Sequence, residues 1–456
     1  MGSRAKEPQE DLNPLPPATD PSLVLTQPTE AEKRQIWTLN HGEWGGALTL
    51  QEYHDREPYL ATIPLAARGG MAHWILTTTT ETEEKEAAES RPVLASCESL
   101  RKRVLYVPAA GSSGGEEVRD GDVREGVGYG VASVYTYPER RGRQYAGRML
   151  SELGPALRTW PRHQARLQDP NGSSTGEQKA QPDGKGAEGQ EEEAICSALW
   201  SDIGKQFYAK KGWAAFPSVH AEFSASTVGE EEEGTTQVTT PITYDTLPTL
   251  CADDERVIRR QLVDTAHATG RTAMAFAPDH DALRWHLFRD DFIAALVYPD
   301  RGPSDVRGAV AVISGDGEEG GRVWAIWTRN YHSKTPAETR DKNTLYILRL
   351  VIESPASSPI STTTTTTDQD PNPALLSAFE SVLQKARHEA RRWDCGKIDV
   401  WNPTPAVRQL IERSGLAHRW VDRDTASVPS LMWYGGPEAT SSGEVEWVAS
   451  EKYCWC

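Results

Sequence analysis

The sequence predicts an α/β (α+β) chain made of two similar halves, each with its own strands and covering helices. The first observation is a shared order of elements: leading helices, three strands, a long helix, a strand and a short helix. The second is that the long helix of each half carries apolar residues at helical spacing along one face. The third is length, because 456 residues exceed what one hydrophobic core usually organises.

In the first half, the third strand leads through a basic turn into the long helix, whose apolar positions include Met149, Leu153 and Leu157. The short helix after the fourth strand ends at Gly212. The predicted elements are, in order, helices within residues 31–66, strands 72–78, 93–101 and 129–135, a helix to about Trp160, strand 195–200 and helix 204–211.

The second half repeats this order after its own leading helices. Asn372 is a plausible N-cap of its long helix, with Pro373 in the first turn. The predicted elements are helices 253–265 and 282–295, strands 307–313, 322–328 and 344–352, helix 373–393, strand 397–401 and helix 405–413.

Composition divides the chain further. We expect a disordered tail at 1–28, a first domain at 29–228, a linker at 229–241 and a second domain at 242–456. Two low-complexity insertions are expected, at about 162–193 in the first domain and about 354–370 in the second. Such surface insertions add little loop-closure entropy and read as solvated spacers.

The composition also excludes some partners. A formal net charge of −17 argues against nucleic acid, since phosphate binding needs a basic surface. No apolar run is long enough to cross a bilayer and no signal-peptide core is present, so we expect a cytoplasmic protein without a membrane partner. The six cysteines are scattered without zinc-site spacing, and we expect reduced thiols and no metal. Nothing in the sequence defines an oligomeric state.

The turn after the strand 129–135 is the most informative segment. An apolar strand stops at Pro138, a basic turn with Arg140, Arg141 and Arg143 follows, and a helix begins. Backbone N–H groups at a helix start lack partners, and the helix dipole adds positive potential there. The turn is therefore suited to hold a diphosphate. The alternative is an ordinary strand–helix turn with basic surface residues.

This turn and the element order resemble the GNAT superfamily of acyl-CoA N-acyltransferases. The resemblance implies a mixed sheet flanked by helices, an enzyme, and acetyl-CoA as co-substrate. The residues that match the family's pyrophosphate loop are Arg141, Gly142, Arg143, Gln144, Tyr145 and Ala146, with Gln144 in place of the usual Gly. The backbone N–H groups of Val134, Tyr135 and Thr136 are the candidates to polarise the thioester carbonyl.

A second motif, residues 199–213, resembles the family's helix beside the pantetheine, and it places Tyr208 where the family often has a general acid. A phenol suits that role because its pKa lies above that of the thiol it protonates. The alternative is a Tyr packed between helix and strand. Glu98 is our candidate for the base, against the alternative of a surface or salt-bridged carboxylate. Asp202 reads as a helix N-cap and Cys97 as a core thiol.

A more specific resemblance is to the fungal lysine N6-acetyltransferase family. It is carried by segments in both halves, among them 200–208, 343–349, 401–405 and 430–435. It implies acetylation of the ε-amine of free L-lysine, in lysine degradation, by direct transfer in a ternary complex. Arg329, Asn343 and Arg349 are candidate substrate-binding residues, with structural ion pairs as the alternative. The second half lacks a basic Gly turn after its strand 344–352, so we expect a second GNAT-like domain without the CoA loop.

Two alternatives stay open at this point. One is a non-catalytic, CoA-binding regulatory protein, motivated by Gln144 and the insertion at 162–193. The other is an acetyltransferase for protein lysines or polyamines.

Overall fold

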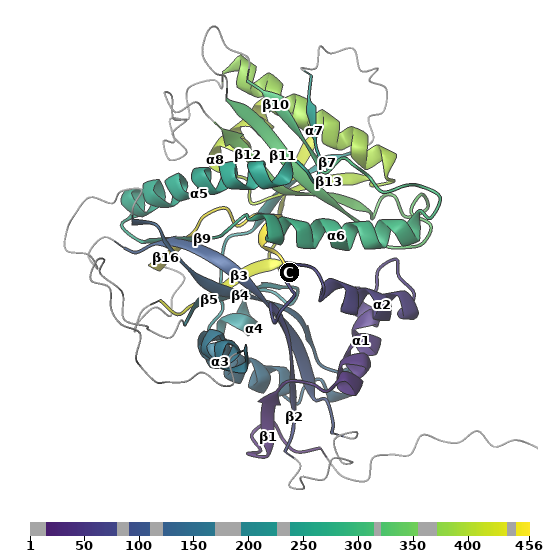
Figure 1. Cartoon of the computed structure of the whole chain (residues 1–456), viewed down its shortest axis with the longest axis vertical. Helices are drawn as coiled ribbons and strands as arrows, with labels where there is room; N and C mark the ends of the chain where they lie inside the picture. The colour runs from purple at the N-terminus through teal and green to yellow at the C-terminus, as the bar shows by residue number, and fades with distance from the viewer. Residues whose placement is uncertain are drawn as a thin grey trace, which may run out of the picture.

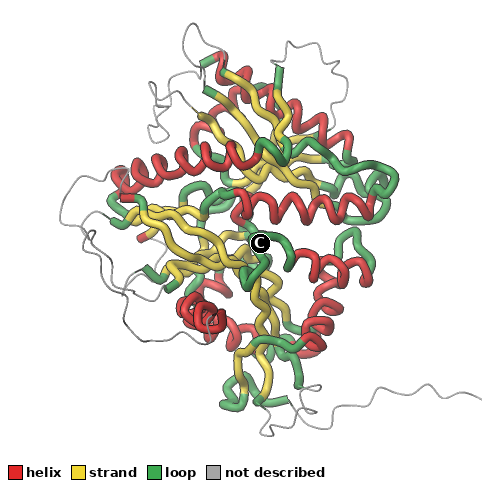
Figure 2. Tube along the Cα trace, viewed as in Figure 1, coloured by secondary structure: helices red, strands yellow, loops and turns green. Residues whose placement is uncertain are grey.

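The structure is a computed structural model that describes residues 15–79, 91–109, 122–168, 193–225, 238–313, 321–353, 372–435 and 444–456. Its strands form two mixed sheets that lie one above the other in Figure 1, with helices between them and on their outer faces. The trace in Figure 2 shows the same layering, with two long helices running between the sheets.

The first sheet has nine strands. Seven follow one path in the order β1-β2-β3-β4-β5-β15-β6. Off this path, β9 pairs with β3, and β16 pairs with β9. The pair β4/β5 is parallel and the other pairs on the path are antiparallel. The strands are β1 (Leu23–Thr26), β2 (Met71–Thr78), β3 (Ala95–Val107), β4 (Arg124–Tyr135), β5 (Ala194–Ser201), β6 (Ala214–Ala215), β9 (Thr272–Phe276), β15 (Val428–Trp433) and β16 (Val445–Trp447).

The second sheet has seven strands in the order β14-β7-β13-β12-β11-β10-β8. Its parallel pair is β12/β13, which stands where β4/β5 stands in the first sheet. The strands are β7 (Val219–Ser224), β8 (Thr240–Ile242), β10 (Gly308–Val312), β11 (Arg322–Asn330), β12 (Thr344–Glu353), β13 (Lys397–Trp401) and β14 (His418–Asp422).

The two sheets exchange a strand beside their parallel pairs, and β9 and β16 of the second half also belong to the first sheet. β7 belongs to the first half by sequence but pairs with β13 and β14 in the second sheet. β15 belongs to the second half by sequence but pairs with β5 and β6 in the first sheet. In the first sheet β15 lies beside β5, and in the second sheet β7 lies beside β13. Each parallel pair is thus flanked by a strand from the other half, and the two halves cannot form their sheets separately.

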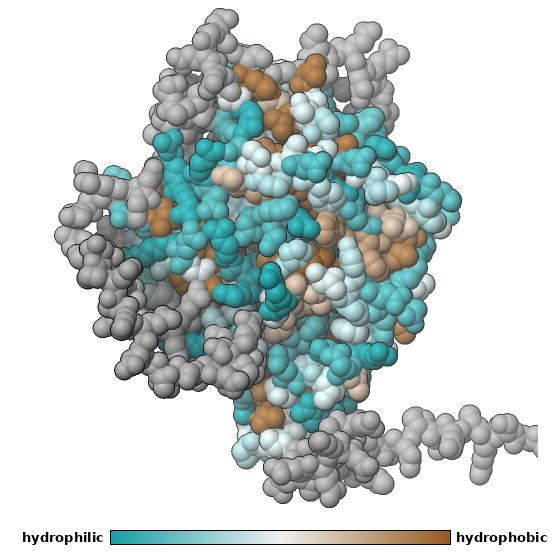
Figure 3. All heavy atoms as spheres, in the orientation of Figure 1, coloured by the Kyte–Doolittle hydropathy of each residue, from teal (hydrophilic) through white to brown (hydrophobic). Residues whose placement is uncertain are grey.

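The helices enclose three cores. α3 covers one face of the first sheet, α7 covers the second sheet, and α5 lies in a core shared by residues of both sheets, among them Trp200 and Trp324. The helices are α1 (Glu30–Trp44), α2 (Leu50–Leu60), α3 (Tyr145–Gln168), α4 (Gln206–Ala209), α5 (Leu247–Thr269), α6 (His280–Val297), α7 (Pro373–Arg392) and α8 (Pro405–Arg413), with 3-10 turns at Pro138–Arg140 and Lys452–Cys454. Hydrophilic residues cover most of the face that Figure 3 shows.

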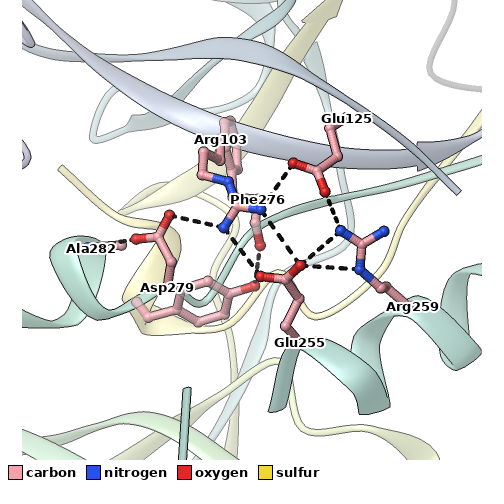
Figure 4. Close-up of polar contacts among 8 residues, drawn as sticks. Arg103, Glu125, Glu255, Arg259, Phe276, Asp279 and Ala282 are labelled. Atoms are coloured by element: carbon pink, nitrogen blue, oxygen red, sulfur yellow. Dashed lines mark hydrogen bonds and ion pairs between the residues drawn. The ribbon is translucent and has the colours of Figure 1, made fainter. Parts of the chain in front are cut away.

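An ion-pair network adds to the contact between the halves. Arg103 on β3 binds Glu125 on β4 and Glu255 on α5, and it lies 3.6 Å from Asp279 at the start of α6. Arg259 on α5 binds the same two glutamates, so the network in Figure 4 joins the first sheet to both helices. These groups are partly exposed, so the network contributes modestly to stability and chiefly fixes orientation.

The predicted elements are present, but the sequence prediction does not include the strands β1, β6, β7, β8, β9, β14, β15 and β16, and two of the expected disordered segments differ. Residues 15–28, expected in the disordered tail, are ordered: β1 pairs antiparallel with β2 because Leu23 fills a position in the core beside α3. α3 continues to Gln168, so the expected insertion at 162–193 begins inside a helix. Residues 1–14, 169–192, 226–237 and 354–371 lie outside the described residues, and with them most of the tail, insertion, linker and loop predictions.

Candidate functional site

The candidate site begins where β4 and β5 separate. Their parallel pairing ends at Val131 and Leu199, so the last four residues of β4 have no partner on β5. On the other side, β4 bulges opposite Cys97, and Ser133 in this bulge has a φ of 52°. A bulge of this kind re-aims the backbone and leaves residues unpaired. Of the predicted carbonyl-polarising residues, Val134 and Tyr135 end β4 and Thr136 follows it.

The predicted anion-binding turn lies at the start of α3. Arg141, Gly142, Arg143 and Gln144 are exposed, while Tyr145 is buried and donates from its hydroxyl to the backbone oxygen of Pro16 at 2.7 Å. Figure 1 shows α3 leaving the end of β4 on one side of the first sheet. The turn therefore presents basic side chains and helix-start N–H groups to solvent, as an anion site requires.

Gln144 adopts the left-handed conformation that the family's Gly usually supplies. Its φ is 65° and that of Gly142 is 80°. A non-Gly residue held there costs on the order of 1 kcal/mol, which an otherwise formed turn can sustain. The substitution thus leaves the backbone path of the loop in place.

Tyr208 lies on the same side of the sheet as α3. Its ring is 8% exposed and packs in the core that contains Cys97 and Met149. Burial raises the pKa of the Tyr208 hydroxyl above its usual value, and the nearby Cys97 and Asp202 act in the same direction. The phenol therefore keeps its proton throughout the neutral range.

Glu98 lies on the opposite face of the sheet, beside the bulge. Its carboxylate accepts a hydrogen bond from the Ser133 hydroxyl at 3.1 Å, and His73 Nε2 lies 3.5 Å away. Burial raises the pKa of Glu98, against the opposing effects of Ser133 and Arg56. Burial also lowers the pKa of His73 to about 4, so His73 is neutral at pH 7 and does not neutralise Glu98.

The second sheet has a corresponding opening, but the chain's own last residues occupy it. β12 and β13 pair only up to Ile347 and Val400. Beyond that point Glu451 accepts a hydrogen bond from the Leu350 N–H at 3.0 Å, and Asn402 donates to the Ser450 backbone oxygen at 2.7 Å. Lys452 enters the opening, with its ammonium 4.0 Å from the centre of the Trp401 ring.

The three predicted substrate-binding residues of the second half have partners within the chain. Arg329 is paired with Asp290, and Arg349 is held by Asp254 at 2.8 Å and by Glu451. Asn343 donates to the backbone oxygens of Pro336 and Asp394. The structure does not bring these three residues to Glu98, and their contacts favour the structural alternative.

Two charged residues near Glu98 were not predicted from the sequence: Arg56 and Glu57 on α2, which form a buried ion pair. Arg289 on α6 lies near this pair. The sequence carries one signal for Arg289. It stands at helical spacing from Trp285, His286 and Ile293, so a charge falls on the buried face of a helix.

One group of potential metal ligands occurs among the described residues: His220, Glu222 and Asp399. Lys397 binds Glu222 at 3.0 Å and lies 3.8 Å from Asp399, and Arg419 binds Glu222 at 2.7 Å. Two cations therefore already balance these carboxylates. No helix in the described part of the chain is long and apolar enough to span a membrane.

Comparison with known proteins adds sequence evidence. Residues 220–456 match the LYC1 GNAT-like C-terminal domain family. The chain is similar to a protein named lysine acetyltransferase from Yarrowia lipolytica, at 24% identity over 190 residues. That match covers 41% of this chain and only 39% of the relative's length.

Solved structures resemble the chain more distantly. A GCN5-related N-acetyltransferase from Kribbella flavida gives a TM-score of 0.43 at 12% identity, over 91% of this chain and 72% of its own. A probable N-acyltransferase from Enterococcus faecalis gives 0.42 at 10%, with the same coverages. N-myristoyltransferase from Saccharomyces cerevisiae gives 0.41 at 7%, over 92% and 82%.

The family match covers slightly more than half of the 456 residues. The chain therefore belongs to the family defined by the LYC1 GNAT-like C-terminal domain.

Proposed function

We propose that the chain transfers the acetyl group of acetyl-CoA to an amine, and that the acceptor is the ε-amine of free L-lysine. The observation that carries the proposal is the unpaired end of β4, which lies between the basic turn at α3 and the buried carboxylate of Glu98. The family membership supports an acyl-CoA donor, and the similarity to a protein named lysine acetyltransferase supports the acceptor.

The residues present fit acetyl-CoA, which supplies the acetyl group as a thioester. The turn from Arg141 to Ala146 would hold the pyrophosphate with backbone N–H groups and basic side chains. The left-handed φ values of Gly142 and Gln144 give the loop a concave path suited to that purpose. Backbone N–H groups of Val134–Thr136, where β4 no longer pairs with β5, would stabilise negative charge on the carbonyl oxygen.

Tyr208 packs in the core beside α3 and Glu98 lies at the β4 bulge, and we assign them the roles of acid and base. Glu98 takes a proton from the acceptor's ammonium, because the amine needs a free lone pair to attack the carbonyl carbon. As the C–N bond forms and the C–S bond breaks, Tyr208 gives its proton to the departing thiolate. The nitrogen gives its second proton to solvent as the amide forms, Glu98 releases its proton to solvent, and the Tyr208 phenolate takes one up, so one proton is released per turnover.

Gln144 favours one rival, a CoA-binding protein without turnover, since it replaces the residue that approaches the phosphate most closely. Turnover decides between the two. Purified protein with acetyl-CoA should release free thiol with L-lysine, and the release should follow lysine concentration to saturation. If lysine, ornithine, polyamines and histone peptides all fail to release thiol, the enzymatic proposal is wrong.

The first residue-level prediction concerns Tyr208. Tyr208→Phe keeps the packed ring and removes the proton donor, so kcat should fall by about 100-fold or more. Tyr106→Phe, a change elsewhere on the first sheet, is the matched control and should leave kcat unchanged. Equal kcat for Tyr208→Phe and wild type would show that Tyr208 is only a core residue.

The second concerns the pH dependence. Protonated Glu98 cannot act as a base, so kcat/KM should fall as pH drops through its pKa, which burial raises above the usual value. Glu98→Gln should lower kcat and abolish this acid limb of the profile. Asp202→Asn, at a carboxylate that accepts a hydrogen bond from the Ser427 N–H and does not cap α4 as expected, should keep it. An acid limb that persists in Glu98→Gln assigns the base to another group.

A further inference from the structure

One face of the second sheet carries a group of buried polar atoms that lack partners. They belong to Ser218 and His220 at β7, to Asp399 and Trp401 on β13, and to Arg423, which follows β14. The atoms without a hydrogen-bond partner among the described residues are Ser218 Oγ, both ring nitrogens of His220, Asp399 Oδ1, Trp401 Nε1, and Nε and Nη1 of Arg423. Arg423 is 6% exposed, His220 8% and Asp399 3%. Because each such atom is costly to bury, their concentration on one surface calls for an explanation.

The strand register places these side chains together. His220 pairs with Trp401 across β7 and β13. Asp399 lies two residues before Trp401, and side chains two residues apart on a strand point to the same face. The Arg423 guanidinium lies over the Trp401 ring, 3.6 Å from its centre, and His220 Nε2 lies 3.8 Å from Asp399 Oδ2. Arg423, His220 and Asp399 therefore lie around Trp401 on one side of the sheet.

Arg423 is a buried cation without a carboxylate. Its guanidinium donates from Nη2 to Asn402 Oδ1 at 3.2 Å, and it forms no ion pair with the residues that the structure describes. Burial lowers the pKa of Arg423 to about 10, so the group keeps its charge at pH 7. An anionic ligand would supply both the missing charge and acceptors for Nε and Nη1.

Asp399 has the opposite deficit. Lys397 faces its Oδ2 at 3.8 Å but binds Glu222 at 3.0 Å, and Oδ1 of Asp399 has no partner in the described part of the chain. Burial raises the pKa of Asp399 to about 6, so it is mainly ionised at pH 7. Burial lowers the pKa of His220 to about 4, so its neutral ring keeps one nitrogen as an acceptor. Asp399 and His220 can therefore accept hydrogen bonds from a cationic group.

The segment that holds Arg423 also contacts the first half. It leads directly into β15, which pairs with β5 as far as Ser201, the last residue of β5. Between Arg423 and β15, the Ser427 N–H donates to Asp202 Oδ1 at 2.8 Å. Arg423 is thus held next to the segment that follows β5, the strand beside which the first sheet opens.

We propose that this face of the second sheet binds the head group of a free α-amino acid, with the carboxylate at Arg423 and the ammonium at Asp399. One small molecule then supplies the anion that Arg423 lacks and the donor that Asp399 and His220 lack. The inference goes beyond the proposed function, because binding needs no acetyl transfer. The amino acid is either the acceptor of the reaction or a second molecule that regulates it, and stoichiometry separates these two sources.

The first test varies the ligand and leaves the protein intact. Calorimetric titration in the presence of CoA should show binding of L-norleucine, which has the head group but no side-chain amine. Norleucinamide lacks the carboxylate and hexanoate lacks the ammonium. Each should bind about 10-fold more weakly or worse, since a hydrogen bond to a charged group contributes roughly this factor. Equal affinities for the three compounds, or no binding of norleucine, would overturn the inference.

The second test changes the residues. Arg423→Met and Asp399→Asn should each weaken norleucine binding about 10-fold or more, and Arg423→Lys should retain more affinity than Arg423→Met. Arg408→Met is the matched control, because Arg408 also lies over a Trp ring, 4.3 Å from the centre of Trp420, but is paired with Glu412. It should bind norleucine as the wild type does. Wild-type affinity in Arg423→Met would show that the inference is wrong.

Melting temperatures separate a loss of binding from a loss of folding. Arg423→Met removes one hydrogen bond to Asn402, whose Oδ1 keeps the Val219 N–H, so the melting temperature should fall by about 4 °C at most. Saturating norleucine should raise the melting temperature of the wild type but not that of Arg423→Met. If Arg423→Met melts far below wild type, the comparison of norleucine with hexanoate on the intact protein decides.

Titration and turnover with L-lysine identify the source of the amino acid. One lysine bound per chain, together with competitive inhibition of turnover by norleucine, identifies the acceptor. Two lysines per chain, one of them lost in an Arg423→Met variant that still turns over, identify a regulatory molecule. Absence of turnover with every amine would overturn the proposed function, while norleucine binding that depends on Arg423 would leave this inference standing.

Discussion

The exchange of β7 and β15 is the constraint on which the rest of the structure depends. Each strand pairs on both sides within the other half's sheet, and β9 pairs with β3, so separating the halves would break these five strand pairings and expose sheet edges. Asn402 stands where the crossing segments meet: its side chain accepts from the Val219 N–H and from Arg423, and it donates to Ser450. The exchange thus fixes α6 over the first sheet.

Each sheet has an opening where its parallel strand pair separates, but different residues lie at the two openings. In the first, the end of β4 is unpaired beside a basic turn. In the second, Glu451 and Lys452 occupy the corresponding place, and Arg349 holds Glu451 there together with Asp254. Buried charges of this kind stabilise the fold little compared with apolar residues. Removal of one partner, however, leaves the other charges buried without compensation, so the ion pairs favour this one arrangement of the segment. The same segment continues to the first sheet, where Lys102 donates to the Cys454 oxygen. The chain itself thus fills the opening of the second sheet.

Much of this could be predicted from the sequence, and the remainder has identifiable causes. The helical spacing of Met149, Leu153 and Leu157 is local information, and it predicted the buried face of α3. Strand partners are not local: the sequence prediction includes no strand at 219–224 or 428–433, and neither segment carries a signal for the sheet that it joins. Likewise, Arg329 and Arg289 look alike in sequence, because their roles depend on which one Asp290 reaches. Whether Gln144 accepts the left-handed conformation was also a question only the backbone could answer.

The central claim is that one opening of two remains available to an acyl-CoA. Calorimetric titration of the full chain with acetyl-CoA tests it most directly. We predict one molecule bound per chain, and loss of that binding in Gly142→Val, because a β-branched residue cannot readily adopt the φ of 80° at that position. Two molecules per chain, or one whose binding is unaffected by Gly142→Val, would contradict the account.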